Sequence, residues 1–296
     1  VKDIFTPALK RELGKHGNKP GAFENITGAT EQVDRVELID QQPLGKSSRS
    51  NPVTYIKSYD AIRELFANQQ LAKIKGLKPK HFSFNVDGGR CETCKGEGEV
   101  VVEMQFLADV HLTCEECNGK RFKDEVLEVT YKDKSIADVL EMTVDEAIVF
   151  FQEEQNIARQ LQPLEDVGLG YVKLGQSSST LSGGEAQRVK LASFLGRGQS
   201  EGAILFIFDE PTTGLHFHDI NKLLGAFSAL INNGHTVIVI EHNMEIVKSA
   251  DYVIDLGPEG GDEGGCLLYQ GEPEGLVNVD ASHTAPFLAK HLNTEE

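Results

Sequence analysis

Two stretches decide the fold of this chain: Leu181-Ser182-Gly183-Gly184-Glu185 and Ile204-Leu205-Phe206-Ile207-Phe208-Asp209-Glu210-Pro211. In the first, Ser182 can cap a following helix, and the two glycines let backbone N–H groups approach an anion at the helix's positive end. The second starts as a short β-rich apolar run, typical of a strand that is covered on both faces. It ends in two carboxylates, at the edge where ligands of open α/β sheets bind.

These carboxylates, and a histidine further along the chain, indicate a nucleotide site. Asp209, at the strand end, can hold Mg²⁺ through water, and Glu210 can orient or deprotonate an attacking water. A second apolar run, Thr236–Ile240, ends close to His242, which is placed to sense a γ-phosphate. Each feature is commonplace alone. In this order they predict an ATP-binding cassette, an α/β core with a mixed or parallel sheet.

The loop that cradles phosphates in such cassettes, G-x-x-x-x-G-K-[ST], is not found upstream of these stretches. Gly45-Lys46-Ser47 follows a strand expected at 36–40, yet Asp40 stands where the loop needs glycine, and Pro43 removes an N–H. Gln41 therefore fits a metal- and water-contacting glutamine loop better. The first residues are neither a signal peptide nor an initiator methionine, which predicts a cut end.

Composition narrows the class of protein. With 296 residues, 40% hydrophobic and 25% charged, the chain can bury a core and hold two domains. No apolar stretch approaches the ~20 residues that span a bilayer, so we expect a soluble, cytoplasmic protein with no membrane partner. The net charge of −17 excludes a protein that is basic all over.

The charge is distributed unevenly along the chain. Between Gln41 and Val86 there are eight basic residues and two acids, a local charge of +6. Such an island suits a confined contact with a phosphate backbone, and a solvated lysine-rich face is the alternative. The candidate DNA contacts are Arg49, Lys73, Lys75, Lys78 and Lys80.

Four of the five cysteines form two C-x-x-C pairs with nineteen residues between them: Cys91, Cys94, Cys114 and Cys117. This spacing fits a zinc ribbon, in which four thiolates close a tetrahedral site and leave no open coordination position, so the metal is structural. Glycines after each pair free backbone N–H groups to turn toward the sulfurs. A disulfide pair is the alternative, although the chain carries no secretory signal.

These landmarks divide the chain into three parts. Residues 1–55 begin the cassette core, 56–170 form a mostly helical insertion with a basic segment and a zinc module at about 84–124, and 171–296 complete the core. We expect helices at 59–68, 135–141, 144–152 and 219–232, and strands at 99–106, 125–131, 236–241 and 252–256. A glycine-rich stretch at 257–265 predicts a last hairpin.

Longer motifs spread over almost the whole chain. They include Arg49–Tyr55, Gly88–Cys91, Val167–Tyr171, Asp209–His216 and Ile240–Asn243. In these motifs the chain resembles the UvrA family, the damage-recognising ATPases of bacterial nucleotide excision repair, and in particular their C-terminal cassette. Transporter cassettes look different, because they carry no four-cysteine insertion ahead of the Leu-Ser-Gly-Gly turn.

The resemblance implies an activity and partners. The family has two cassettes per chain and works as a dimer that scans duplex DNA, reads distortion rather than sequence, and loads UvrB. ATP and Mg²⁺ bind between the phosphate loop of one cassette and the Leu-Ser-Gly-Gly turn of the other. The expected partners are damaged double-stranded DNA, a UvrB-like protein and a second UvrA-like subunit in an excision nuclease complex.

The resemblance also implies roles for single residues. Gln41 is the glutamine-loop residue, Asp209 the magnesium ligand, Glu210 the catalytic base and His242 the switch histidine. The γ-phosphate clamp consists of Ser182, Gly183, Gly184 and Glu185. The loop that crosses the cassette interface consists of Thr213, Gly214, Leu215 and His216. The zinc ligands are Cys91, Cys94, Cys114 and Cys117, and the stretch that lies near DNA carries Arg49 and Lys73–Lys80.

Without a phosphate cradle, we expect this chain by itself to lose several kcal/mol of nucleotide affinity and to hydrolyse ATP hardly at all. Three alternatives stay open. One is a non-enzymatic zinc and DNA-binding module, and another is a related cassette of antibiotic resistance. The third is a DnaJ-like zinc chaperone, suggested by the pattern at Cys91–Gly98.

Overall fold

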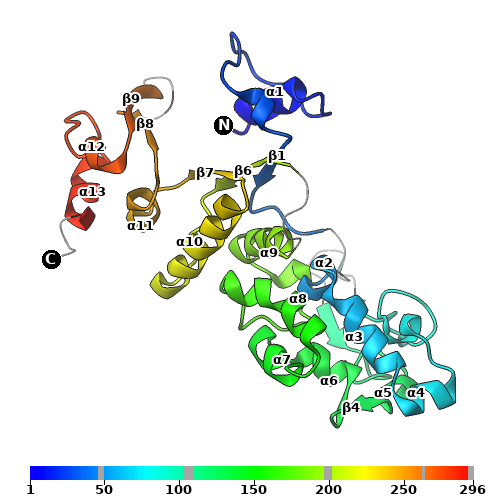
Figure 1. Cartoon of the computed structure of the whole chain (residues 1–296). Helices are drawn as coiled ribbons and strands as arrows, with labels where there is room; N and C mark the ends of the chain where they lie inside the picture. Colours follow the sequence, from blue (N-terminus) through cyan, green and yellow to red (C-terminus); the bar gives the residue numbers. More distant parts are fainter. Residues whose placement is uncertain are drawn as a thin grey trace. The chain divides into compact units, whose positions relative to one another are not determined.

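The computed structural model describes residues 1–45, 50–102, 104, 110–196, 202–259, 261 and 264–292. Arg49, a candidate DNA contact, lies outside these residues. The chain forms two compact units, one of Val1–Asp40 with Gly202–Glu296 and the other of Gln41–Glu201 (Figure 1). No helix among the described ranges is both long and apolar enough to cross a membrane.

A parallel sheet forms the centre of the first unit. Its strands are β1 (Arg35–Ile39), β6 (Ile204–Asp209) and β7 (Thr236–Ile240), in the order β1-β6-β7. Both pairings are parallel, so the three strands end at the same edge. The α/β class predicted from the sequence is therefore confirmed.

Alternate residues of β6 pack on opposite faces of this sheet. Leu205 and Ile207 join a buried cluster with Leu9. On the other face, the Phe208 ring lies 4.7 Å from the Phe227 ring, centroid to centroid. The helices that carry these partners are α1 (Phe5–Glu12) and α10 (Phe217–Asn232). The continuous apolar run of β6 thus reflects burial on both faces, as expected.

The rest of the first unit follows β7. An antiparallel pair of strands forms the predicted last hairpin, with the glycine-rich stretch between its strands. Short helices lie before and after it and pack on one another. These elements are α11 (Met244–Lys248), β8 (Val253–Gly257), β9 (Cys266–Gly271), α12 (Pro273–Leu276) and α13 (Ala285–Leu292), and the short helix η1 (Thr30–Gln32) precedes β1.

The second unit is mostly helical. Its helices are α2 (Pro52–Tyr55), α3 (Ser58–Ala67), α4 (Gln70–Lys75), η2 (Pro79–Phe82), α5 (Asp124–Leu127), α6 (Ile136–Glu141), α7 (Val144–Phe150), α8 (Gln155–Asp166), η3 (Ser178–Thr180) and α9 (Gly183–Leu195). Two short antiparallel pairs complete it: β2 (Glu99–Val102) with β3 (Val110–Thr113), and β4 (Thr130–Tyr131) with β5 (Lys134–Ser135).

Local sequence fixes where several of these helices begin. Ser135 caps α6, Thr143 caps α7 and Ser182 caps α9. In each case an acidic side chain three residues later accepts a hydrogen bond from the N–H of the capping residue. These reciprocal capping boxes satisfy backbone donors that a helix start leaves unpaired.

An aromatic core joins α3 to the segment that carries the first cysteine pair. The Tyr59 ring lies 5.3 Å from the Phe84 ring, and Phe84 lies edge-on to Phe122 at 6.5 Å. The Tyr59 hydroxyl donates to the carbonyl oxygen of Phe82 at 2.7 Å. All four rings are buried. This packing attaches the cysteine-bearing segment to the helical body of its own unit.

One predicted strand is wrong. Residues 125–131 begin inside helix α5 (Asp124–Leu127), and only Thr130–Tyr131 at their end is a strand. Asp124 and Glu125 lie in the first turn of α5, where carboxylates favour the positive end of a helix. Val126 is fully buried. The short apolar run therefore packs as one helical turn, because tertiary packing outweighs its strand-like composition.

The compact units divide the chain at positions other than 55/56 and 170/171. The boundaries at 40/41 and 201/202 place α9 in the helical unit, because α9 packs against α8 and α2. Of the strand expected at 99–106, Glu99–Val102 forms β2, and residues 103, 105 and 106 lie outside the described part of the chain.

Candidate metal centre and nucleotide site

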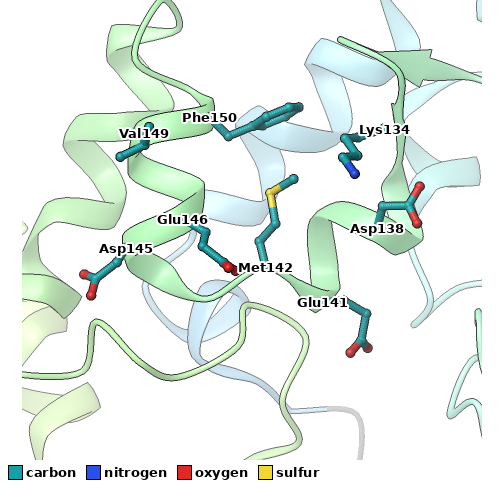
Figure 2. A pocket seen from close by; sticks show the side chains of 8 residues that line it. All are labelled: Lys134, Asp138, Glu141, Met142, Asp145, Glu146, Val149 and Phe150. Atoms are coloured by element: carbon teal, nitrogen blue, oxygen red, sulfur yellow. The ribbon is translucent and has the colours of Figure 1, made fainter.

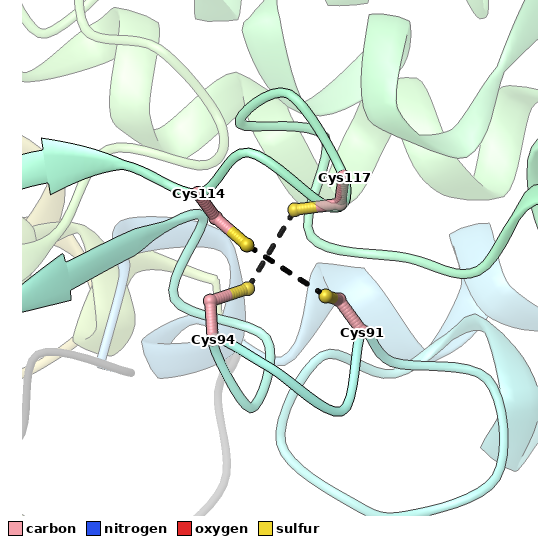
Figure 3. A group of neighbouring side chains, drawn as sticks. All are labelled: Cys91, Cys94, Cys114 and Cys117. Carbon is pink, nitrogen blue, oxygen red and sulfur yellow. Dashed lines mark hydrogen bonds between the residues drawn. The ribbon is translucent and has the colours of Figure 1, made fainter.

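The four paired cysteines lie together at the base of the β2–β3 pair. Their sulfur atoms are all within 4.8 Å of one another, and all four side chains are buried (Figure 3). The Sγ atoms of Cys91 and Cys114 are 3.9 Å apart, and those of Cys94 and Cys117 are 3.6 Å apart. Since a disulfide needs about 2.05 Å between sulfurs, neither pair is bonded, and all four are free thiols.

These distances fit a zinc ion. A tetrahedral site with Zn–S bonds of about 2.3 Å places its sulfurs about 3.8 Å apart, close to both separations. Four buried sulfurs that converge on one point, with no disulfide, form a complete ligand set for zinc. The predicted zinc-binding cluster is thus confirmed as a geometric unit, and the disulfide alternative is wrong.

Backbone N–H groups support the sulfurs. The Gly98 N–H donates to Cys94 Sγ at 3.3 Å, as expected of the glycines that follow each cysteine pair. Donation from the Cys117 backbone lowers the pKa of the Cys114 thiol to about 7, whereas burial raises the pKa of Cys117 to about 12. A metal ion offsets the cost of burying thiolates, because it binds only the deprotonated form.

The turn after each cysteine pair uses left-handed backbone. Gly96 has φ +88° and Gly119 has φ +80°. At Gly96 a Cβ atom would lie 2.1 Å from the carbonyl oxygen of Phe84, so the backbone itself fills the space. At Gly119 the nearest atom would be a Thr113 methyl at 3.5 Å, an ordinary contact. Only the first turn therefore needs glycine for space as well as for conformation.

The Leu-Ser-Gly-Gly-Glu turn opens helix α9, as predicted. The Glu185 N–H donates to Ser182 Oγ at 3.3 Å, and the Ser182 N–H donates to Glu185 Oε2 at 2.7 Å. Ser182 is exposed and Gly184 is buried. The positive end of a 13-residue helix therefore faces solvent at Ser182.

A tyrosine that sequence reasoning missed also holds this turn. The Tyr171 hydroxyl donates to Glu185 Oε1 at 2.6 Å, and the guanidinium of the buried Arg188 donates to the Tyr171 oxygen at 3.4 Å. Burial, and after it the bond to Glu185, raise the pKa of Tyr171 to about 12. Burial opposes ionisation of Glu185, yet the bonds from Tyr171 and Ser182 hold its pKa below the ordinary value.

Gln41 lies against the same turn. A Cβ atom on Gly183 would come within 2.9 Å of the Gln41 Cβ atom and 3.1 Å of the Gln41 carbonyl oxygen. Glycine at position 183 is therefore needed for this close approach of two backbone segments. The helical unit thus brings Gln41 together with Ser182, Gly183, Gly184 and Glu185.

The predicted carboxylates lie at the carboxyl edge of the parallel sheet in the other unit. Asp209 is the last residue of β6 and pairs in register with Ile240 at the end of β7. Its carboxylate forms an ion pair with Lys2, and the hydrogen bond from Lys2 raises the pKa of that ammonium group. Lys2 is a further contact of this site that the sequence alone did not indicate.

Glu210 and His242 approach each other at this edge. The distance between Glu210 Oε1 and His242 Nε2 is 3.9 Å, and both side chains are exposed. Glu210 has φ +49°, a left-handed conformation that non-glycine residues rarely adopt. Such strain persists only where surrounding contacts impose it, and it clusters at functional sites.

The segment predicted to cross the cassette interface follows directly. Thr213, Gly214 and His216 are exposed, and Leu215 is half-buried. The Thr213 N–H donates to the Glu210 carbonyl oxygen at 3.2 Å, and the Leu215 N–H donates to the Thr212 oxygen at 2.9 Å. This turn is therefore tied to Glu210 through the backbone.

The candidate DNA contacts lie on α4 and the segment after it. Lys73, Lys75, Lys78 and Lys80 are all exposed. Lys75 forms an ion pair with Glu128, which neutralises part of its charge. The other three lysines give the surface of this segment its positive charge.

The helical unit also has an open hollow of about 790 Å³ between α6 and α7 (Figure 2). Three of its acidic side chains already have structural roles, since Asp138 and Glu146 cap helices and Glu141 pairs with Lys173. The hollow shares no residue with the cysteine cluster or with the α9 turn. It adds nothing to either candidate site.

Comparison with known proteins places these features in a class. A parallel sheet with paired acids at its carboxyl edge, a capped Leu-Ser-Gly-Gly-Glu helix and a four-cysteine cluster define a cassette of the ABC type with a metal-binding insertion. No family model matches the chain. Over 99% of its length it superposes on the crystal structure of UvrA2 from Deinococcus radiodurans, with a TM-score of 0.87 and 44% identity, and it covers 34% of that chain.

Sequence relatives give the same family. The chain is 53% identical over 292 residues to the UvrABC system protein A of Clostridium perfringens and 51% identical over 296 residues to that of Staphylococcus aureus. These matches cover 99% and 100% of this chain and 31% of each relative. The chain belongs to the UvrA family and spans about a third of the length of the relatives that it matches.

Proposed function

We propose that this chain is part of a DNA-damage-recognition ATPase of nucleotide excision repair. The observation that carries the proposal is the pair Glu210–His242, 3.9 Å apart beside Asp209 at the carboxyl edge of a parallel sheet, in a chain of the UvrA family. Paired acids at this edge are the usual place for Mg²⁺-dependent phosphoryl chemistry.

Each side chain has a role in ATP hydrolysis. Asp209 would hold Mg²⁺, which neutralises charge on the β- and γ-phosphates when it is bound. Glu210 orients and deprotonates the attacking water, and His242 donates a hydrogen bond toward the γ-phosphate. The turn from Ser182 to Glu185 offers backbone N–H groups to the γ-phosphate of a nucleotide held by a partner cassette.

The helical unit supplies the DNA contact. Lys73, Lys78 and Lys80 meet phosphates without reading bases, which suits recognition of distortion rather than sequence. Zinc held by the four cysteines would tie together the two turns that flank the β2–β3 pair, which is a structural role. The partners are damaged duplex DNA, a UvrB-like protein and a second UvrA-like subunit.

A chimaera tests this function. In the Clostridium perfringens relative, the matched segment is replaced by this chain and the chimaera is expressed in a bacterial strain that lacks its own UvrA. We expect restored survival after ultraviolet irradiation and DNA-stimulated ATP turnover by the purified protein. Glu210→Gln should lower kcat about 100-fold or more, because it removes the base that activates water.

The control is Asp251→Asn, which neutralises an exposed acid of the same unit outside the sheet edge. This variant should keep both survival and turnover. A chimaera that neither restores survival nor hydrolyses ATP would contradict the proposed function. Turnover that persists in Glu210→Gln would contradict the role of this residue.

A further inference from the structure

We infer that Glu241 is a positioning residue that clamps the turn after β6 to the turn after β7 and thereby sets the spacing of Glu210 and His242. The inference rests on the proposed function, because the spacing matters only if these two groups act on ATP. It assigns a role to the side chain of Glu241, which lies in the sequence between the end of β7 and the candidate switch histidine, His242.

One carboxylate holds both turns. Glu241 Oε1 accepts the Thr212 N–H at 2.8 Å and the Thr212 hydroxyl at 2.5 Å. Glu241 Oε2 accepts the N–H groups of His242 at 2.8 Å and Asn243 at 3.0 Å. Four donors on one ionised group make a strong junction, since hydrogen bonds to a charged acceptor are about twice as strong as neutral ones.

The junction constrains Glu210 from its C-terminal side. The Glu210 N–H donates to the Ile240 carbonyl oxygen at 2.9 Å, which prolongs the β6–β7 ladder by one residue. The chain then leaves the ladder at φ +49° and reaches Thr212, where the carboxylate holds it. With the ladder on one side and the clamp on the other, Glu210 stays in its strained conformation.

Helix capping does not explain Glu241. The next helix, α11, is capped by Asn243, whose side-chain oxygen accepts the Glu245 N–H at 2.9 Å. The helix start is therefore satisfied without Glu241. What Glu241 adds is the link across to Thr212, 29 residues earlier in the chain. A side chain whose contacts join two functional turns acts on their relative position.

Hydrogen exchange on the 296-residue chain tests the clamp without ATP. Glu241→Gln keeps the shape of the side chain, yet its amide nitrogen faces N–H donors on one side and loses those bonds. We expect the backbone amides of Thr212, His242 and Asn243 to exchange at least about tenfold faster than in the unsubstituted chain. Glu245→Gln, which alters a neighbouring acid paired with Lys248, should leave the Thr212 amide unchanged. Equal exchange in both variants would overturn the inference.

Kinetics of the chimaera test the functional consequence. Glu241→Gln should lower kcat about tenfold or more and leave the KM for Mg-ATP within about threefold, because His242 is the one assigned nucleotide contact that the clamp positions. The double variant Glu210→Gln/Glu241→Gln should be no slower than Glu210→Gln alone, since Glu241 acts through Glu210 and His242. Additive losses, or a rise in KM alone, would show a general structural effect and reject positioning.

The two proposals fail in different ways. An unsubstituted chimaera without ATP turnover contradicts the proposed function, and hydrogen exchange then decides alone whether the clamp exists. A chimaera that hydrolyses ATP equally well with and without Glu241→Gln contradicts the clamp and leaves the proposed function standing.

Discussion

Two glycine-to-alanine substitutions in the zinc module, at Gly96 and at Gly119, can be compared. The comparison separates the effect of a steric clash on stability from the effect of a left-handed backbone conformation. The two glycines occupy equivalent places, two residues after the second cysteine of each pair, and have similar φ values of +88° and +80°. A Cβ atom at Gly96 would lie 2.1 Å from the Phe84 carbonyl oxygen, whereas at Gly119 the nearest atom lies at 3.5 Å. Both substitutions therefore place alanine in a left-handed conformation, and only Gly96→Ala adds a steric clash.

The shared cost is the left-handed conformation, about 1–2 kcal/mol for alanine. At Gly96 the backbone of Phe84 must also move by about an ångström, and overpacking of this kind costs typically ~1–3 kcal/mol or more. We therefore expect Gly119→Ala to destabilise the folded chain by about 1–2 kcal/mol and Gly96→Ala by about 2–5 kcal/mol. For a unit of this size the additional ~1–3 kcal/mol corresponds to a Tm gap of roughly 2–12 °C.

Thermal unfolding of the zinc-loaded chain, and zinc release to a chromogenic chelator, measure the two effects. Gly96→Ala should unfold at the lower temperature and release zinc faster, because moving Phe84 disturbs the turn that carries Cys94. Gly119→Ala should stay close to the unsubstituted chain in zinc release. Equal Tm losses in the two variants would refute the reasoning, since they would show that the Phe84 contact contributes nothing.

Two further predictions concern charge. Neutralising Lys73 and Lys78 together should flatten the dependence of DNA affinity on salt, log K against log[salt], by about two units, as measured by filter binding. Neutralising Lys75, which is paired with Glu128, should change the slope less. Burial lowers the pKa of His235, so the stability that its neutral form contributes is present above pH 6.5 and is lost as pH falls below that value. The Tm should drop less between pH 7.5 and 5.5 in His235→Asn than in the unsubstituted chain, and an equal drop would contradict this assignment.

Features encoded by spacing within one segment were predictable from the sequence. The two cysteine pairs predict the four-cysteine cluster, because each C-x-x-C turn brings two sulfurs to one side. The cap of α9 was predictable for the same reason, since Ser182 and Glu185 are three residues apart and satisfy each other. The apolar run of β6 revealed burial on both faces. In these cases the determinants are local, and periodicity or spacing reports them directly.

The rest depended on contacts between distant segments. Residues 125–131 have the composition of a strand, yet the buried side chain of Val126 places their first part in a helical turn. Tyr171 holds Glu185 across 14 residues. The spacing of these two residues does not predict such a bond, because a single exposed tyrosine is common on any protein surface.

Glu241 is a further residue whose contacts join distant segments. The sequence singles out its neighbour, the histidine, since a histidine after a buried strand suggests chemistry. The structure shows that the glutamate before it accepts four hydrogen bonds from two turns. A strained Glu210 alone would relax toward ordinary φ values, because that conformation costs of order 1–3 kcal/mol. Four charge-assisted bonds exceed this cost, so under the proposed function the position of the base depends on a second carboxylate, that of Glu241.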